Sequence, residues 1–451
     1  MTCVLINQLL AMARPRIIAG IDVGSSKIAT VIGSAEEEEK QVKIIGAASV
    51  PSRGIRKGQI VNIEEAANAV VESVEAAERM AGYSLTQAMV SINGPHIASQ
   101  NSRGVVAVAE PEGEINDSDV RRVIEAAKAI SLPSSREVIH VIPRYFTVDG
   151  QDGIKDPAGM SGVRLEVETH IVTGSATAMR NLAKCVSEVG ADVQNLVSAG
   201  LASAEATLTE TEKELGVVLV DIGGGVTDVV VFIEGSPFYT TVLPIGAKNV
   251  TNDLAIGLRL SLESAEKIKM VFSEKKETMK PKKTKPASKE EEENETVGSD
   301  EDEIDLKELG IIEDIRKVSK KTLTDGIIRP RLNEIFTMVG LELKKSEAIG
   351  LTPAGIVITG GGAMTVGIKE AAKRNLSMPI RIGIPQDISG LADEAEKPDF
   401  ATAVGLLHHG VKSEVRGISN FSLLKIGKRL EKIPFRGVAG RVTDLIKQFL
   451  P

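Results

Sequence analysis

A short hairpin with an aspartate at the end of its first strand occurs twice, at residues 17–32 and 217–232. Each copy has an apolar strand ending in Asp22 or Asp221, a short turn of small residues and a second strand rich in β-branched residues. Small residues let backbone N–H groups approach phosphate oxygens closely. A carboxylate at the strand end can hold Mg²⁺ through water. The repeat therefore predicts a duplicated domain with two phosphate-binding turns.

A third glycine-rich strand end occurs at residues 355–371. An apolar strand leads into Gly360, Gly361 and Gly362, and a helical pattern follows. This order suits a nucleotide that rests on a glycine platform and a helix N-terminus. One Asp-x-Gly hairpin is usually an ordinary β-turn, but three glycine-rich strand ends in sequence favour an ATP-binding fold.

Composition narrows the class of protein. A chain of 451 residues is long enough for about three domains, and its Val/Ile-rich runs fit strands buried on both faces. Cys3 and Cys185 cannot form a disulfide framework and fit a reducing cytoplasm. The net charge of −8 argues against nucleic acid as a partner. The histidines lack zinc-site spacing, and no apolar run approaches the ~18 residues of a membrane span.

The hydrophobic periodicity predicts alternating strands and helices. Strands are expected within 15–50, 88–94, 137–149 and 163–173, and helices at 63–82, 115–130, 175–189, 250–270 with a break near Arg259–Ser261, and 325–348. The stretch from 88 to 172 has its own α+β rhythm, which predicts a small inserted domain.

Charged and glycine-rich segments interrupt this pattern. Residues 274–289 carry a net charge of +5 and residues 290–305 a net charge of −10, with almost no apolar side chains. Such a segment cannot bury enough surface to offset chain entropy, so we expect a disordered loop, although the opposite charges could collapse on one another. Residues 413–440 resemble a linker. The start of the chain, with Met12 as an alternative first residue, resembles a frayed extension.

The last residues form an apolar stripe at helical spacing. The stripe consists of Val442, Leu445, Ile446, Phe449 and Leu450. Arg441 and Lys447 lie beside it, and the chain from Lys425 onward has a net charge of +5. A basic amphipathic helix on a flexible arm favours an anchor on an anionic membrane surface. A helix docked on the protein's own core is the alternative.

Several stretches resemble one family. They are SINGPHI (91–97), the run at 140–174 that contains GMSGVRLEVETH, the run at 200–225, and the amphipathic tail. With the three glycine-rich elements, these stretches resemble the actin/sugar-kinase/heat-shock ATPase superfamily and, within it, the bacterial cell-division family FtsA. The resemblance implies a two-lobed α/β fold of the actin-like (ribonuclease-H-like) type with an inserted α+β subdomain and a C-terminal amphipathic helix.

The resemblance also implies subdomain boundaries. They are an N-terminal extension (1–14), subdomain 1A (15–87 with 173–215 and 397–412), an inserted subdomain 1C (88–172), subdomain 2A (216–247 with 340–396), subdomain 2B (248–339, containing the charged loop 274–305), a linker (413–440) and a membrane-targeting helix (441–451).

The family's site positions transfer residue by residue. The resemblance places Asp22 and Asp221 beside Mg²⁺, and it assigns to ATP the positions Gly24, Ser25, Ser26, Lys27, Gly223, Gly224, Gly225, Thr227, Asn252, Asp253, Glu266, Lys269, Gly360, Gly361 and Gly362. Val226 departs from the family, which usually has threonine directly after the glycines, so slow hydrolysis is expected. Glu205 is the candidate carboxylate for orienting water.

The implied function is structural. A member of this family would bind ATP, self-associate into filaments, recruit other division proteins and attach FtsZ filaments to the cytoplasmic face of the cell membrane. Arg331 and Glu334 match polar positions of the helix that receives the FtsZ C-terminal peptide; an ordinary exposed helix pair is the alternative. Two rival functions remain open, a pilus-assembly adaptor similar to PilM and a small-molecule kinase or phosphatase of the same superfamily.

Overall fold

The computed structural model describes residues 16–35, 41–109, 113–278, 303–305, 317–391 and 393–415. The expected N-terminal extension, the linker from residue 416 and the membrane-targeting helix lie outside the described residues. Residues 413–415 belong to helix α11 (Ala401–Val415), so the expected start of the linker at 413 is wrong. Within the described ranges, no helix is long and apolar enough to cross a membrane.

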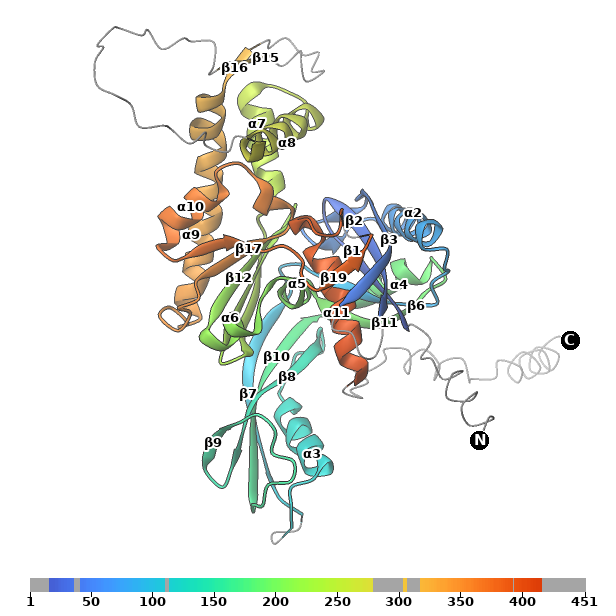
Figure 1. Cartoon of the computed structure of the whole chain (residues 1–451), viewed down its shortest axis with the longest axis vertical. Coiled ribbons are helices and arrows are strands. Elements are labelled where there is room, and N and C mark those ends of the chain that lie inside the picture. The colour runs from blue at the N-terminus through green and yellow to red at the C-terminus, as the bar shows by residue number, and fades with distance from the viewer. Residues whose placement is uncertain are drawn as a thin grey trace, which may run out of the picture. The chain divides into compact units, whose positions relative to one another are not determined.

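The first lobe is built on a six-stranded sheet with the order β11-β6-β1-β2-β3-β19 (Figure 1). Its strands are β1 (Arg16–Val23), β2 (Lys27–Ala35), β3 (Val42–Pro51), β6 (Gln87–Ile92), β11 (Asp192–Ser198) and β19 (Ile388–Gly390). β1 and β2 pair antiparallel with Asp22 opposite Ala29, so the first Asp hairpin forms as expected. A small hairpin of β4 (Ile55–Arg56) and β5 (Gln59–Ile60) follows.

Helices cover both faces of this sheet because its strands are apolar on both sides. Besides α11, the lobe contains α2 (Ile63–Ala81), α4 (Ala176–Ser187) and α5 (Ala199–Thr207). Successive residues of β2 point to opposite faces. Thr30 is hydrogen-bonded to Ser73 of α2 at 2.8 Å, whereas Val31 belongs to a buried cluster with Val404 and Leu407 of α11.

The position of β6 corrects the expected start of the inserted segment at residue 88. β6 pairs in parallel with β1 and with β11, so it completes the first-lobe sheet. The insertion therefore begins after Ile92. The expected strand beginning at residue 88 is confirmed, but it pairs with β1 and β11 of the first lobe rather than with strands of the insertion.

The second lobe and the insertion share a nine-stranded sheet with the order β18-β17-β12-β13-β14-β7-β10-β8-β9. The second-lobe strands are β12 (Val217–Ile222), β13 (Thr227–Ile233), β14 (Ser236–Leu243), β17 (Ile356–Thr359) and β18 (Ile380–Ile382). β12 and β13 form the second Asp hairpin, with Asp221 opposite Asp228. β17 pairs in parallel with β12, which brings the third glycine-rich turn beside that hairpin.

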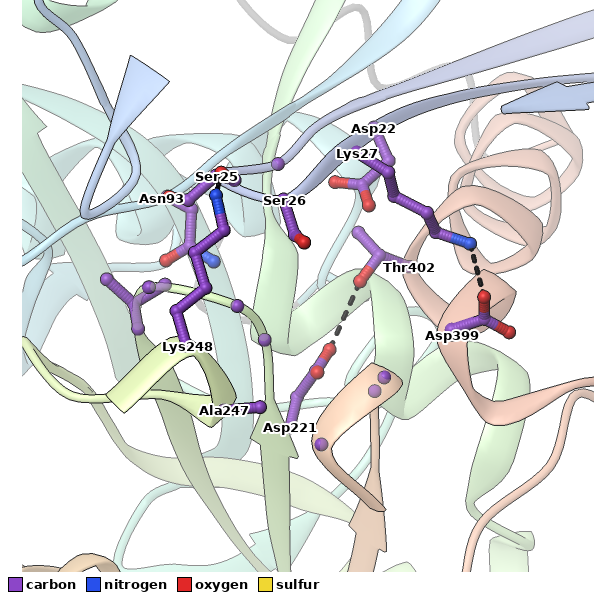
Figure 2. Close-up of a pocket in the computed structure, with 18 of the residues that line it drawn as sticks. Asp22, Ser25, Ser26, Lys27, Asn93, Asp221, Ala247, Lys248, Asp399 and Thr402 are labelled. Atoms are coloured by element: carbon purple, nitrogen blue, oxygen red, sulfur yellow. Dashed lines mark hydrogen bonds and ion pairs between the residues drawn. The ribbon is translucent and has the colours of Figure 1, made fainter. Parts of the chain in front are cut away.

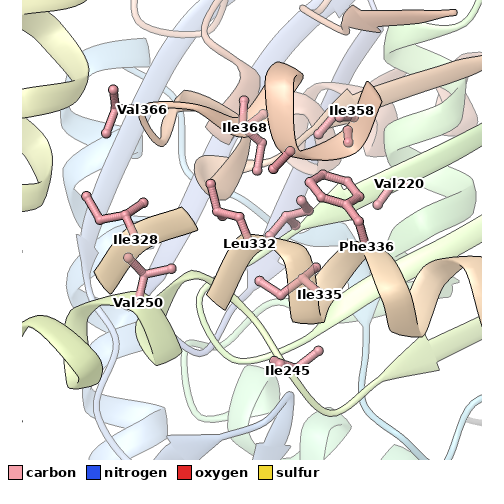
Figure 3. Close-up of a cluster of buried hydrophobic side chains, with 14 of the residues drawn as sticks. Val220, Ile245, Val250, Ile328, Leu332, Ile335, Phe336, Ile358, Val366 and Ile368 are labelled. Atoms are coloured by element: carbon pink, nitrogen blue, oxygen red, sulfur yellow. The ribbon is translucent and has the colours of Figure 1, made fainter. Parts of the chain in front are cut away.

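Helices pack on the second-lobe sheet around one apolar core. They are α7 (Ala247–Leu258), α8 (Leu262–Thr278), α9 (Arg329–Lys345) and α10 (Ile368–Leu376), with the π-helix η2 (Thr322–Ile328) and the short 3-10 turn η3 (Gly361–Met364). The short helix α6 (Glu210–Leu215) precedes β12, and the 3-10 turn η4 (Pro398–Phe400) places Phe400 in the first-lobe cluster with Val404 and Leu407. Figure 3 shows Leu332, Ile335 and Phe336 of α9 in a cluster with Val220 of β12 and Ile358 of β17. The expected break in the 250–270 helix is confirmed, because Arg259 caps α7 in the left-handed conformation.

The insertion contains β7 (Ala98–Ala107), α3 (Asp117–Lys128), β8 (Arg136–Val148), β9 (Gln151–Ile154) and β10 (Arg164–Ser175). Asn116 caps α3 and forms a capping box with Asp119, which explains why this helix begins within the predicted range 115–130. β7 also pairs with β14 at Ala98 and Thr241. The sheet of the insertion is therefore continuous with that of the second lobe.

The charged segment is shorter at both ends than expected. α8 continues to Thr278, so residues 274–278 are helical rather than part of a disordered loop. β15 (Glu303–Asp305) pairs antiparallel with β16 (Lys317–Ser319). The remaining part, residues 279–302, lies outside the described residues. The boundaries expected from low apolar content are wrong for two reasons. A helix can extend beyond its apolar stripe, and two strands can pair through backbone hydrogen bonds without apolar side chains.

Candidate nucleotide site

A cavity of about 260 Å³ is lined by both Asp hairpins and by the third glycine-rich turn (Figure 2). The sequence-predicted residues that line it are Asp22, Gly24, Ser25, Ser26, Lys27, Asp221, Gly223, Gly224, Gly225, Glu266, Lys269, Gly360, Gly361 and Gly362. These residues come from four separate parts of the chain, the two hairpins, helix α8 and the third glycine-rich turn. The fold brings them together because β1, β12 and β17 all end at the same opening.

The hairpin turns are tight and approach each other closely. Gly24 N–H donates to Lys27 O at 3.1 Å, and Gly223 N–H donates to Val226 O at 2.9 Å. A Cβ atom on Gly224 would lie within 3.0 Å of Ser26. Gly360 has φ +81, and a Cβ there would overlap Asp221 Oδ1. Glycine is needed at these positions because Gly224 approaches the first-lobe turn at Ser26 and Gly360 approaches Asp221 of its own lobe, each leaving no room for a Cβ atom.

Of the two hairpin aspartates, Asp221 is buried and Asp22 is half-buried, and each accepts a hydrogen bond from a different side chain. Asp22 Oδ1 accepts a hydrogen bond from Ser91 Oγ at 2.7 Å, and burial raises its pKa above the ordinary value. Asp221 Oδ2 accepts from Thr402 Oγ1 at 3.1 Å. Burial raises the pKa of Asp221 to about 6, and the charge of Asp22 adds to this effect. Deprotonation of each of these carboxyl groups is therefore less favourable in this cavity than in water.

A third carboxylate, Asp228, was not anticipated. It lies on β13 opposite Asp221 and lines the cavity. Asn93, which follows β6 in the first lobe, donates from Nδ2 to Asp228 Oδ2 at 2.7 Å. Burial and then the charge of Asp221 raise the pKa of Asp228 well above its ordinary value. Three neighbouring acids, of which Asp221 and Asp228 are buried and Asp22 is half-buried, indicate a place where positive charge is to be bound.

The donor set fits hydrated Mg²⁺ rather than a cation held by protein ligands alone. Across the described part of the chain, no group of three or more His, Cys, Asp and Glu side chains is placed to hold a metal ion. Mg²⁺ usually keeps several waters and binds through one or two carboxylates together with substrate phosphates. Asp22 and Asp221 at the turn ends suit that arrangement, and the ion would offset the repulsion among the three acids.

The raised pKa values predict how the nucleotide-free protein responds to pH. A carboxyl group with a higher pKa in the folded state binds protons more tightly there, so stability rises as pH falls toward that pKa. We expect Asp228→Asn to raise the free energy of unfolding at pH 8 by about 1–3 kcal/mol, the usual cost of an uncompensated buried group. The variant should also flatten the rise in melting temperature between pH 8 and 6, measured without divalent cations. An unchanged profile would contradict a charged, strained Asp228.

Lysines and glutamates occupy the remaining walls. Lys27 Nζ is 2.6 Å from Asp399 Oδ2 and lies 3.7 Å from the ring centre of Phe400. Lys269 Nζ is 2.7 Å from Glu266 Oε2. The Glu-x-x-Lys pair of α8 is therefore joined by an ion pair and lines the cavity from the second lobe.

Four expected site residues lie elsewhere. Glu205 does not line the cavity, and its carboxylate is 3.8 Å from Lys213 Nζ, so a role in orienting water does not fit its position. Thr227 Oγ1 donates to Ile245 O at 2.8 Å. Strand alternation explains this, because Val226 and Asp228 face the cavity and Thr227 faces the other side. Asn252 is exposed on α7, and Asp253 accepts from Arg331, so neither reaches the cavity.

The expected partner residues form one network. Arg331 donates to both carboxylate oxygens of Asp253, at 2.6 and 2.8 Å, and also pairs with Glu334 one turn further along α9. These hydrogen bonds raise the pKa of Arg331. The three residues join α7 to α9 at the surface of the second lobe, so Arg331 is held in a fixed orientation rather than as a free surface side chain.

Five polar side chains that line the cavity were not predicted from the sequence. They are Asn93, Asp228, Lys248, Asp399 and Thr402. Asp228 could have been found from the sequence, because it is a charged residue at the second position of an otherwise apolar strand. The other four could not, since each reaches the cavity from a loop or a helix start.

The chain is similar to known cell division proteins. A sequence profile described as "Cell division protein FtsA" matches residues 218–405, and one described as "SHS2 domain inserted in FTSA" matches residues 94–173. The chain is 38% identical over 404 residues to Cell division protein FtsA of Pseudomonas aeruginosa, covering 90% of this chain and 91% of that protein. It is 41% identical over 391 residues to the protein of the same name from Borreliella burgdorferi, covering 87% and 90%.

A solved structure supports the fold. The backbone is similar to the structure described as "PilM-PilN type IV pilus biogenesis complex", with a TM-score of 0.59 and 16% identity over 87% of this chain and 98% of that one. At this identity the likeness concerns the fold alone. With the profile of the inserted domain, it confirms the expected two-lobed α/β fold that carries an inserted α+β segment.

Proposed function

Because this chain belongs to the FtsA family of cell division proteins and has an actin-like fold, we propose that it binds Mg²⁺-ATP between its lobes and, in that state, self-associates and tethers FtsZ filaments to the cytoplasmic face of the cell membrane. The cavity formed by the two Asp hairpins and the Gly360–Gly362 turn carries the nucleotide part of this proposal. Recruitment of other division proteins would follow from the same assembly.

The polar groups of the cavity fall into two sets. The hairpin turns offer backbone N–H groups and the carboxylates Asp22 and Asp221, which suit phosphates and Mg²⁺. Glu266, Lys269 and the glycines at 360–362 form the second set, against which ribose and adenine would lie. Mg²⁺, when bound, would neutralise phosphate charge. The protein's own part is to orient the nucleotide and to exclude water.

A ligand that touches both lobes favours the state in which the lobes are close. Three cross-lobe hydrogen bonds already lie at the cavity, from Asn93 to Asp228, from Thr402 to Asp221 and from Lys248 to Ser25. We therefore infer that ATP stabilises a closed, assembly-competent form. Hydrolysis would be slow, because Val226 supplies no hydroxyl beside the second phosphate turn and Glu205 lies outside the cavity.

The partner surface is proposed on α9. The Arg331–Asp253–Glu334 network presents a fixed guanidinium flanked by two carboxylates at the second-lobe surface. An acidic and apolar peptide such as the FtsZ C-terminal segment could use such a surface, with Ile256 and Leu262 exposed on the same subdomain. A fixed cation costs less entropy to engage than a mobile one.

The membrane anchor is proposed for the C-terminal stripe, which lies outside the described residues. Five apolar side chains entering the interface would contribute at most about 1.5–3 kcal/mol each. Ordering the backbone offsets about 1 kcal/mol or more per residue, and each nearby Lys or Arg adds about 1 kcal/mol on anionic lipid. A single chain would thus bind weakly and reversibly, whereas a filament would hold through many tails at once.

The rival functions are less well supported. The pilus-complex structure shares the fold at 16% identity, compared with 38% and 41% for the two FtsA relatives. A kinase or phosphatase would need a substrate pocket and a base beside the phosphates, and it would have no use for a basic amphipathic tail. Turnover of small phosphorylatable substrates at rates well above ATP hydrolysis would favour that class.

One co-sedimentation experiment separates the proposed roles. Anionic vesicles, FtsZ and this protein are pelleted together with Mg²⁺-ATP. We expect Leu445→Glu to remove both proteins from the vesicle pellet, because it places charge on the apolar stripe. Arg331→Glu should lose FtsZ while the protein itself still pellets, and Arg329→Glu, an exposed neighbour on α9, should behave like wild type. Full vesicle binding by Leu445→Glu would refute the anchor, and unaltered FtsZ recovery with Arg331→Glu would move the partner surface elsewhere.

A further inference from the structure

Lys248 connects the second lobe to the first hairpin. It is the second residue of α7, whose first turn is fixed against the second hairpin by hydrogen bonds from Ala247 N–H to Gly223 O and from Lys248 N–H to Gly224 O. From there its side chain crosses the cavity, and Nζ donates to Ser25 O at 2.7 Å. Figure 2 shows Lys248 extending to Ser25 in the first phosphate turn. A second-lobe cation thus lies on a first-lobe turn.

Its partner distinguishes Lys248 from the other lysines of the cavity. Lys27 is paired with Asp399, and Lys269 is paired with Glu266. In the described ranges, Lys248 instead donates to a neutral backbone carbonyl. Desolvation lowers its pKa, an effect opposed by the charge of Glu266 and reinforced by that of Lys269. The Lys248 ammonium pairs with a neutral carbonyl rather than a carboxylate, so its positive charge can bind an anionic ligand between these turns.

The position of Nζ coincides with the place where the two hairpins meet. Gly225 faces Ser25 and Gly224 faces Ser26 so closely that a Cβ on either glycine would lie within 3.0 Å of the serine. Phosphates of a nucleotide held by both turns would lie at this meeting point, beside Ser25 O, the group that Lys248 now contacts.

We propose that Lys248 recognises the terminal phosphate of a nucleoside triphosphate, exchanging Ser25 O for a terminal phosphate oxygen. The inference rests on the proposed ATP binding and specifies how that site distinguishes triphosphate from diphosphate. A charge-assisted bond to phosphate is stronger than one to a neutral carbonyl, so the exchange is favourable when the terminal phosphate is present. With a diphosphate, Lys248 remains on Ser25, and the contact between lobes is made by protein alone.

Equilibrium titration with Mg²⁺-ATP and Mg²⁺-ADP tests this assignment. We expect Lys248→Met to weaken ATP binding at least ~10-fold and ADP binding less than ~3-fold, because only the triphosphate loses a charge-assisted bond. Lys248→Arg, which keeps the charge, should recover most of the ATP affinity. Lys267→Met is the matched control, since Lys267 lies on the exposed side of α8 and pairs with Glu263. It should bind both nucleotides like wild type.

The outcomes are separable. Equal losses for ATP and ADP with Lys248→Met would overturn the assignment, because the lysine would then serve the fold or the shared phosphates. Unchanged ATP affinity would overturn it as well. A wild-type protein that binds neither nucleotide would instead refute the proposed function on which the inference rests. Thermal melting of each variant without nucleotide shows whether a loss arises from unfolding rather than from the phosphate contact.

Discussion

Replacing Gly405 with alanine is expected to lower the free energy of unfolding by about 2–4 kcal/mol, at or above the usual range for overpacking. Gly405 lies on α11 where that helix crosses α5, and an added Cβ would overlap the carbonyl oxygen of Ala202. The overlap is with backbone, so no side chain can turn aside to relieve it. The two helices would have to separate, and Leu406 would leave the buried cluster it forms with Met89.

The same substitution should reach the nucleotide site. Thr402, one turn earlier on α11, donates to Asp221, so a displaced helix would loosen that hydrogen bond. Urea unfolding followed by circular dichroism measures the stability, and nucleotide titration measures the second effect. Gly340→Ala is the control, because it lies within α9, meets only the tip of Leu376 at 3.1 Å and gains up to about 1 kcal/mol of helix propensity. Equal behaviour of the two variants would show that the α5–α11 crossing can relax.

Neutralising either hairpin aspartate is expected to reduce Mg²⁺-dependent ATP affinity by about 100-fold or more, which corresponds to ~2.8 kcal/mol. Asp22→Asn and Asp221→Asn keep the shape of each side chain and its hydrogen bond from Ser91 or Thr402. They remove the charge that holds hydrated Mg²⁺. Because burial penalises that charge in the empty cavity, neither variant should be less stable than wild type without nucleotide.

Fluorescent ATP titration with and without EDTA measures this effect. Wild type should lose affinity when EDTA removes Mg²⁺, and the two variants should already bind as weakly as EDTA-treated wild type. Asp192→Asn, an exposed aspartate at the start of β11, serves as the control for an acid-to-amide change. Retention of tight, EDTA-sensitive binding by both variants would remove the cavity from consideration as the nucleotide site.

Features that depend on neighbours in the chain could be read from the sequence. The two Asp hairpins formed because an apolar strand, a small-residue turn and a β-branched strand need no distant partner to be recognisable. α2 begins after Asn62 and ends at Gly82, since capping hydrogen bonds are made within one turn. The family resemblance then assigned the lobes, and it placed Glu266 and Lys269, whose spacing alone suited an ordinary helix surface.

Features that depend on distant pairing were decided only by the tertiary structure. β6 has the pattern of any apolar strand, and its place between β1 and β11 follows from sheet topology, which a residue pattern does not encode. Asp228 lines the cavity and Thr227 does not, because successive side chains of a strand point to opposite faces. Lys248 lies 223 residues from Ser25, and Asn93 lies 135 residues from Asp228. Such contacts form only when the two folded lobes come together at the cavity. A local stretch of sequence indicates only the preferred backbone conformation and which face of an element is apolar.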